Sequence, residues 1–180
     1  MEYLITYGLA LFVILIVLAI LVAVVLPSLQ APETCQFTQP GFSCSTKKHA
    51  LVYDTDDDVV KILFQLDNQQ GKPIDLYGVH CSSVAPANIK KSDVRGLPEI
   101  DPQLPEYMQM AAGRSITVGG ADADIEAQLV CKNEDGSNVV LAPGSNFRGS
   151  IAITYRFSED LPGAPTRLAV ATVTGTIQEQ

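Results

Sequence analysis

The chain has 180 residues, of which 47% are hydrophobic and 18% are charged, and its formal net charge at pH 7 is −8. This length suits one domain, or one domain with an appendage. With 12 basic against 20 acidic residues, the composition argues against a nucleic-acid partner, because such a protein needs a basic face.

The hydrophobic surplus lies in one segment near the N-terminus. From Gly8 to Leu26 no residue carries a polar side chain. As a helix, this segment would span about 28 Å, close to the hydrocarbon thickness of a bilayer. It has no polar face, so every side of the helix needs an apolar neighbour. The sequence therefore predicts a hydrophobic α-helix over residues 1–26, surrounded by lipid or by identical helices.

Glu2 is the only charge in this segment, and the first basic side chain of the whole chain is Lys47. A signal peptide or an ordinary single-span anchor would carry Lys or Arg beside its apolar run, so neither pattern fits. Glu2 has two interpretations. It is a solvated carboxylate that interacts favourably with the helix dipole, or it pairs with the amino terminus of a neighbouring subunit. Since an unpaired buried charge is costly, such pairing would fix the axial register of packed helices.

The segment resembles the N-terminal helix of archaeal type IV pilins, the superfamily that also contains archaellins. The resemblance lies in Glu2-Tyr3-Leu4, in Thr6-Tyr7-Gly8 and in the aliphatic run behind them, and it covers roughly residues 1–30. In that family a prepilin peptidase removes a basic leader, and a glutamate lies near the start of the mature helix. By resemblance that glutamate is Glu2. Since only Met1 precedes it, the chain is expected to be a mature or truncated form.

The resemblance also implies partners and a surface for polymerisation. The partners are many copies of the same chain, the pilus assembly machinery and the prepilin peptidase, with the membrane as the partner before assembly. Small residues allow helices to approach closely, and lipid tails are about as apolar as aliphatic side chains, so exchange of lipid for sister helices is feasible. The residues predicted to serve polymerisation are Glu2, Tyr3, Gly8, Ala10, Phe12, Leu15, Ala19 and Leu26.

Pro27 is expected to end the helix, because proline lacks the N–H donor and restricts the residue before it. Residues 27–34 are predicted to form a proline-containing connector, with Pro27 as its hinge. From Cys35 onward the hydrophobic pattern has period two. The clearest run, residues 150–157, places Ile151, Ile153, Tyr155 and Phe157 on one face of a strand.

Further strands are expected between clusters of Gly, Pro, Asn and Asp. They are Ala50–Tyr53, Val59–Leu66, Ile74–Ser82, Ser115–Val118, Ile125–Cys131, Asn138–Leu141 and Leu168–Ile177. Residues 86–113 are predicted to form a long loop with a helical turn at Tyr107–Ala112. The predicted fold class is thus a long N-terminal hydrophobic α-helix followed by an all-β, immunoglobulin-like antiparallel sandwich head over residues 35–180.

The four cysteines all lie beyond the apolar segment, as expected for an exported head. Three pairings are possible. We favour Cys35–Cys44, which closes a local loop, and Cys81–Cys131, which joins two predicted strands. The cysteine spacings fit no zinc motif, and His49 and His80 are not paired in sequence, so no metal site is expected.

The acidic run Asp54–Asp58 resembles the first half of a calcium loop. Val59 and Gln65 stand where that loop needs glycine and a bidentate glutamate, so a solvated turn is favoured over a weak Ca²⁺ site. No nucleophile elbow, phosphate-binding loop or zinc-protease motif is present, and the prediction is a non-enzyme without a cofactor.

These observations predict a structural subunit of an archaeal type IV pilus-like surface filament. The subunit would polymerise through its N-terminal helix and serve adhesion or surface attachment. It would be located in the cell membrane before assembly and in an extracellular filament afterwards. Two alternatives remain: a monomeric, membrane-anchored extracytoplasmic β-domain that acts as a binding module, and an archaellin-type subunit of a motility filament.

Overall fold

A computed structural model describes the backbone except at residues 1, 29–31, 45–48, 121 and 180, and the side chains except at residues 1–6, 24–31, 45–48, 121 and 180. The chain divides into two compact units, Met1–Ala31 and Pro32–Gln180. Each unit is described separately below.

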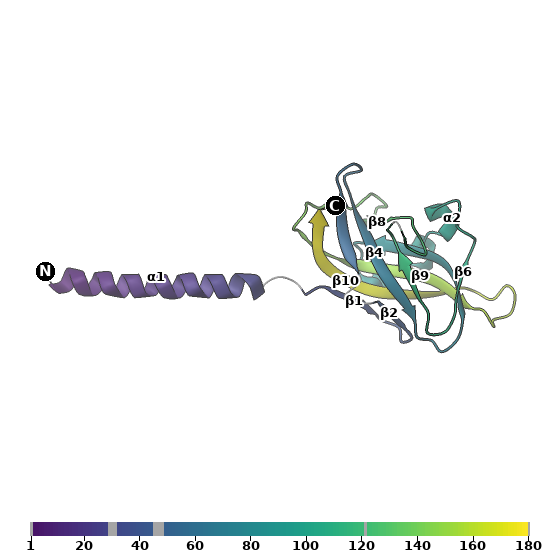
Figure 1. Cartoon of the computed structure of the whole chain (residues 1–180), viewed down its shortest axis with the longest axis horizontal. Coiled ribbons are helices and arrows are strands. Elements are labelled where there is room, and N and C mark those ends of the chain that lie inside the picture. Colours follow the sequence, from purple (N-terminus) through teal and green to yellow (C-terminus); the bar gives the residue numbers. More distant parts are fainter. Residues whose placement is uncertain (1, 29–31, 45–48, 121, 180) are drawn as a thin grey trace. The chain divides into compact units, whose positions relative to one another are not determined.

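The first unit is the helix α1 (Glu2–Ser28; Figure 1). Its backbone stays helical through Pro27 and ends one residue later, whereas the sequence predicted an end before this proline. Proline weakens the preceding turn but does not force the helix to end at its own position. Among the residues whose side chains are described, no helix meets the length and apolarity needed to cross a membrane.

The second unit is built from ten strands with three short helical segments between them. The strands are β1 (Thr34–Phe37), β2 (Phe42–Cys44), β3 (Ala50–Asp54), β4 (Val59–Asn68), β5 (Ile74–Ser82), β6 (Met108–Met110), β7 (Ser115–Val118), β8 (Leu129–Lys132), β9 (Asn146–Phe157) and β10 (Arg167–Glu179). The helical segments are η1 (Pro86–Asn88), η2 (Lys91–Asp93) and α2 (Leu97–Ile100).

Six of these strands close into a β-barrel (Figure 1). Around the ring, β10 pairs with β3, β3 with β4, β4 with β8, β8 with β5, β5 with β9, and β9 with β10. The β10–β3 and β8–β5 pairs are parallel, and the other four are antiparallel. The remaining strands extend the edges: β1 lies on β10, β2 and β7 on β4, and β6 on β5.

The predicted fold class is therefore wrong. The structure is a mostly β protein whose second unit is a closed barrel, not an immunoglobulin-like two-sheet antiparallel sandwich. The physical reason lies in the two parallel pairs. They join strands that are far apart in sequence through long crossover connections, and hairpin-like punctuation between strands does not reveal such pairs.

Individual strand predictions had mixed outcomes. The strands at residues 74–82 and 115–118 have the predicted bounds. The predicted strand at 138–141 is absent from the described strands, and β8 begins at Leu129 rather than at Ile125. The predicted helical turn at 107–112 is wrong, because Met108–Met110 forms β6 against β5. Both β1 and β2 were missed, since each is short and its pairing is with distant strands.

The barrel interior is a single apolar core, and β9 shows how it is filled. Ile151, Ile153 and Tyr155 belong to this core, as their alternation predicted. The opposite face of β9 is also covered, because Ala152 packs with Val170 and with Ile89 from the loop that follows β5. This loop over the outside of the barrel creates the cavity described below.

Candidate functional site

The described part of α1 exposes apolar side chains in an unbroken series. The predicted polymerisation residues Gly8, Ala10, Phe12, Leu15 and Ala19 are all exposed. Phe12 is 62% exposed and Leu15 is 57% exposed. Scattered exposed apolar residues are ordinary on soluble proteins, but a contiguous apolar surface is typical of an interaction site.

The side chains of Glu2, Tyr3, Leu26 and Pro27 lie outside the described residues. The pairing of Glu2 with a neighbouring amino terminus therefore stays a prediction.

Two disulfides crosslink the second unit, and they are the pairs that the sequence analysis favoured. Cys35 of β1 is bonded to Cys44 of β2, with a Cα–Cα distance of 5.6 Å. Cys81 of β5 is bonded to Cys131 of β8, at a Cα–Cα distance of 4.4 Å, across one of the parallel strand pairs. Both bonds are compatible with an extracellular location.

The acidic run 54–58 forms the turn between β3 and β4. Lys61 lies at the centre of its polar contacts: its Nζ atom donates to Asp54, and to Asp57 at 3.2 Å. The Lys61 hydrogen bond is the main reason why the pKa of Asp54 lies below its usual value. Asp58 adopts a left-handed conformation with φ 57°. Across the described residues, no group of three or more His, Cys, Asp or Glu side chains is placed to hold a metal ion.

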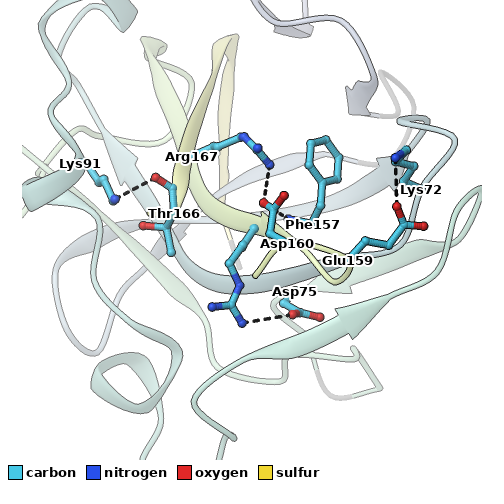
Figure 2. A network of polar contacts seen from close by, with 9 residues as sticks. Lys72, Asp75, Lys91, Phe157, Glu159, Asp160, Thr166 and Arg167 are labelled. Atoms are coloured by element: carbon cyan, nitrogen blue, oxygen red, sulfur yellow. Dashed lines mark hydrogen bonds and ion pairs between the residues drawn. The ribbon is translucent and has the colours of Figure 1, made fainter. Parts of the chain in front are cut away.

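A second charged cluster surrounds the turn of the β9–β10 hairpin (Figure 2). Figure 2 shows Arg167 directed at Asp160, at 2.8 Å, and Lys72 directed at Glu159, at 2.9 Å. The guanidinium of Arg167 also lies over the ring of Phe157, 4.4 Å from its centroid. Each of these cations has a carboxylate partner, so we assign the cluster to fixing the hairpin rather than to binding.

A cavity of about 580 Å³ lies on the outside of the barrel. One wall is the end of β5, with His80 and Ser82, and another is the loop 84–95 that includes η1 and η2. The third wall is the end of β8 and its following turn, from Lys132 to Gly136. This volume lies within the range of ordinary small-molecule sites.

His80 is the most buried titratable group of this cavity, at 7% exposure. Its Nδ1 atom has no hydrogen-bond partner among the described residues. Burial lowers the pKa of His80 below its ordinary value of 6.5, and the nearby positive charges of Arg95 and Lys132 lower it further, while Asp93 opposes them. His80 is therefore held in its neutral form near pH 7.

Arg95 is brought to the cavity by a close backbone contact. Gly96 forms an isolated antiparallel bridge with Gly78 of β5. A Cβ atom on Gly78 would collide with the carbonyl oxygen of Arg95. Glycine at this position thus lets the segment 94–97 pack directly on the strand that carries His80.

Sequence reasoning placed His80 on a strand but did not find this cavity. The available signal was the group of three cations, Lys90, Lys91 and Arg95, within an acidic chain. Their segment was predicted only as part of the long loop over residues 86–113. Its position over β5 depends on the non-local Gly78–Gly96 bridge, which no local pattern indicates.

Comparison of the chain with protein-family models, with characterised proteins and with solved structures finds no match.

Proposed function

We propose that this protein is a structural subunit of a type IV pilus-like surface filament of the archaeal kind, that it is not an enzyme, and that it serves adhesion or surface attachment. The observation that carries the proposal is the exposed apolar series on α1, from Leu9 to Val22. Exposed apolar area costs roughly 25 cal/mol per Å² relative to burial. A single subunit leaves this free energy unused, and association of α1 helices would realise it.

The second unit supports the same proposal. Two disulfides crosslink it, as suits a protein module outside the cell. In the proposed filament the α1 helices pack in the centre, and the acidic second units form the outer layer. A head-to-tail contact whose rotation does not close produces an open helical polymer of this kind. Before assembly, membrane lipid would cover the apolar side chains of α1.

Electron microscopy of material sheared from cells without detergent tests this function. The expected result is filaments that contain this chain, identified by mass spectrometry. If the chain is found only in detergent-extracted membranes, the filament proposal fails and the membrane-anchored binding module is favoured. If shed filaments are found, loss of motility without loss of attachment in a deletion strain would favour the motility alternative.

The proposed role of Glu2 needs a separate substitution. In the Glu2→Ala variant, we expect assembly to fail, because the helices lose the contact that fixes their axial register. The matched control is Glu33→Ala, which removes the next carboxylate along the chain, outside the apolar segment. Unchanged filaments in Glu2→Ala would contradict the pairing with a neighbouring amino terminus but not the filament itself.

A further inference from the structure

The cavity beside His80 differs from the rest of the protein in its charge. The chain as a whole carries a net charge of −8. The cavity is lined by three cationic side chains and two carboxylates, which are Lys90, Arg95, Lys132, Asp93 and Glu134. One of the carboxylates is already engaged, since Asp93 accepts the backbone N–H of Lys90 at 2.8 Å. The cavity is therefore a locally cationic site on an acidic protein.

Two nitrogen atoms in this cavity lack partners although they are buried. They are Nδ1 of His80 and Nε of Arg95. Buried polar atoms without a hydrogen bond cost free energy, and most proteins avoid them. Within the described part of the chain, Arg95 takes part in no ion pair, whereas Arg167 and Lys72 of the hairpin cluster each face a carboxylate (Figure 2).

We propose that this cavity is a binding site for an oxyanion, either a carboxylate or sulfate group on a sugar-sized ligand or a free inorganic oxyanion. Arg95 is the primary partner, because a guanidinium presents a planar pair of donors that matches an oxyanion. His80 contributes its unpartnered Nδ1 atom from the β5 wall of the cavity, and Lys132 adds positive charge from β8. This site lies entirely in the second unit and does not depend on the filament proposal.

The arrangement of the site favours an anion over a cation or an apolar ligand. A cation would face Arg95 and Lys132 at the inner walls, while Asp93 and Glu134 are exposed at the rim. An apolar ligand would leave the two unpartnered nitrogen atoms unsatisfied. The bridge between Gly78 and Gly96 fixes the backbone of Arg95 on β5, so the site is formed before the ligand binds.

Titration calorimetry with the full-length chain in detergent tests the proposal. The probes are sodium glucuronate, glucose as its neutral counterpart, and sodium sulfate. We expect glucuronate or sulfate to bind and glucose not to bind. Arg95→Gln should weaken binding at least about tenfold, because it removes a charge-assisted hydrogen bond. Lys72→Gln is the matched control, since it removes a cation that is already paired with Glu159, and its affinity should equal that of the unmodified protein.

The probes also separate the two sources of the oxyanion. Tighter binding of glucuronate than of sulfate assigns the site to an acidic sugar, and binding of sulfate alone assigns it to a free inorganic anion. His80→Gln provides a second variant and is expected to weaken binding while the Arg95 segment stays in place. Equal affinity for glucose and glucuronate, no binding of any probe at millimolar concentration, or unchanged affinity in Arg95→Gln would overturn the proposal.

Discussion

Leucine has opposite environments in the two units of this molecule. Leu66 and Leu76 in the barrel have no exposed surface, whereas Leu15 and Leu18 of α1 are 57% and 52% exposed. Burial of such a side chain is worth about 1.5–3 kcal/mol. In the barrel this free energy stabilises the fold itself. In α1 it is not realised within a single chain, and it is available for association with lipid or with other helices.

A charged side chain introduced on α1 should therefore have a larger effect than changes in the barrel. It should act on filament assembly and leave the stability of the barrel unchanged. In the proposed filament, we expect Leu15→Lys to reduce assembly below detection, because every copy would carry a charge into the packed apolar centre. The barrel should unfold at the same urea concentration as in the unmodified protein. Electron microscopy and urea denaturation measure these two outcomes.

The matched control is Leu161→Lys, which places the same charge at an 81% exposed leucine of the second unit. Its filaments should form normally. Labelling of free thiols in the cell-associated protein distinguishes failed export from failed assembly, since an exported chain has oxidised its cysteines. Normal filaments in Leu15→Lys would remove the basis for assigning assembly to α1.

The two disulfides contribute to the stability of the second unit by different amounts. The bond between Cys81 and Cys131 closes a separation of 50 residues, and that between Cys35 and Cys44 closes a separation of 9. In the chain-entropy description, the longer loop contributes about 4 kcal/mol and the shorter about 3 kcal/mol. Replacing both cysteines of a pair by alanine should lower the free energy of unfolding by these amounts.

Urea denaturation followed by tyrosine fluorescence measures this difference, since the chain has six tyrosines and no tryptophan. The shorter bond is the matched control for the longer one. Equal losses of stability for the two pairs would mean that loop length does not set their contributions.

Removing a single methyl group from an isoleucine in each unit tests whether the two units differ in packing. Ile153 has no exposed surface in the barrel core, whereas Ile14 of α1 is 57% exposed. We expect Ile153→Val to lower the free energy of unfolding by about 1 kcal/mol, because it leaves a small cavity. Ile14→Val should leave this free energy unchanged, and equal effects at the two positions would contradict the contrast between the units.

The same contrast explains what the sequence could predict. The clusters of Gly, Pro, Asn and Asp beside them located β5 and β7 with their bounds, because such residues favour turns at strand ends. The barrel closure was not predictable, since it depends on parallel pairing of β10 with β3 and of β5 with β8. The cavity was missed for a related reason: Arg95 and His80 meet only because Gly78 admits the backbone of a distant loop.

The smallest expected effect is the pH dependence that His80 gives to the free energy of unfolding. The pKa of His80 in the folded protein lies below its ordinary value of 6.5, because burial and the charges of Arg95 and Lys132 disfavour its protonation. Between the folded and the unfolded pKa values the unfolded chain binds more protons. The free energy of unfolding should therefore be fully maintained above pH 6.5 and should decrease as the pH falls below it. The charged groups that act on His80 are Arg95 and Lys132, which disfavour its protonation, and Asp93, which favours it.

The variant His80→Gln isolates this contribution, because glutamine has no charge to gain. The difference in unfolding free energy between His80→Gln and the unmodified protein should be constant above pH 6.5 and should shift in favour of the variant as the pH falls. The two proteins differ only at position 80, so the contributions of all other groups cancel in the difference. A constant difference from pH 8 down to about pH 5, a range set by the ordinary titration of histidine, would mean that His80 does not resist protonation. An added oxyanion that binds at Arg95 should reduce the pH dependence, since the bound negative charge raises the pKa of His80 and makes its protonation less costly.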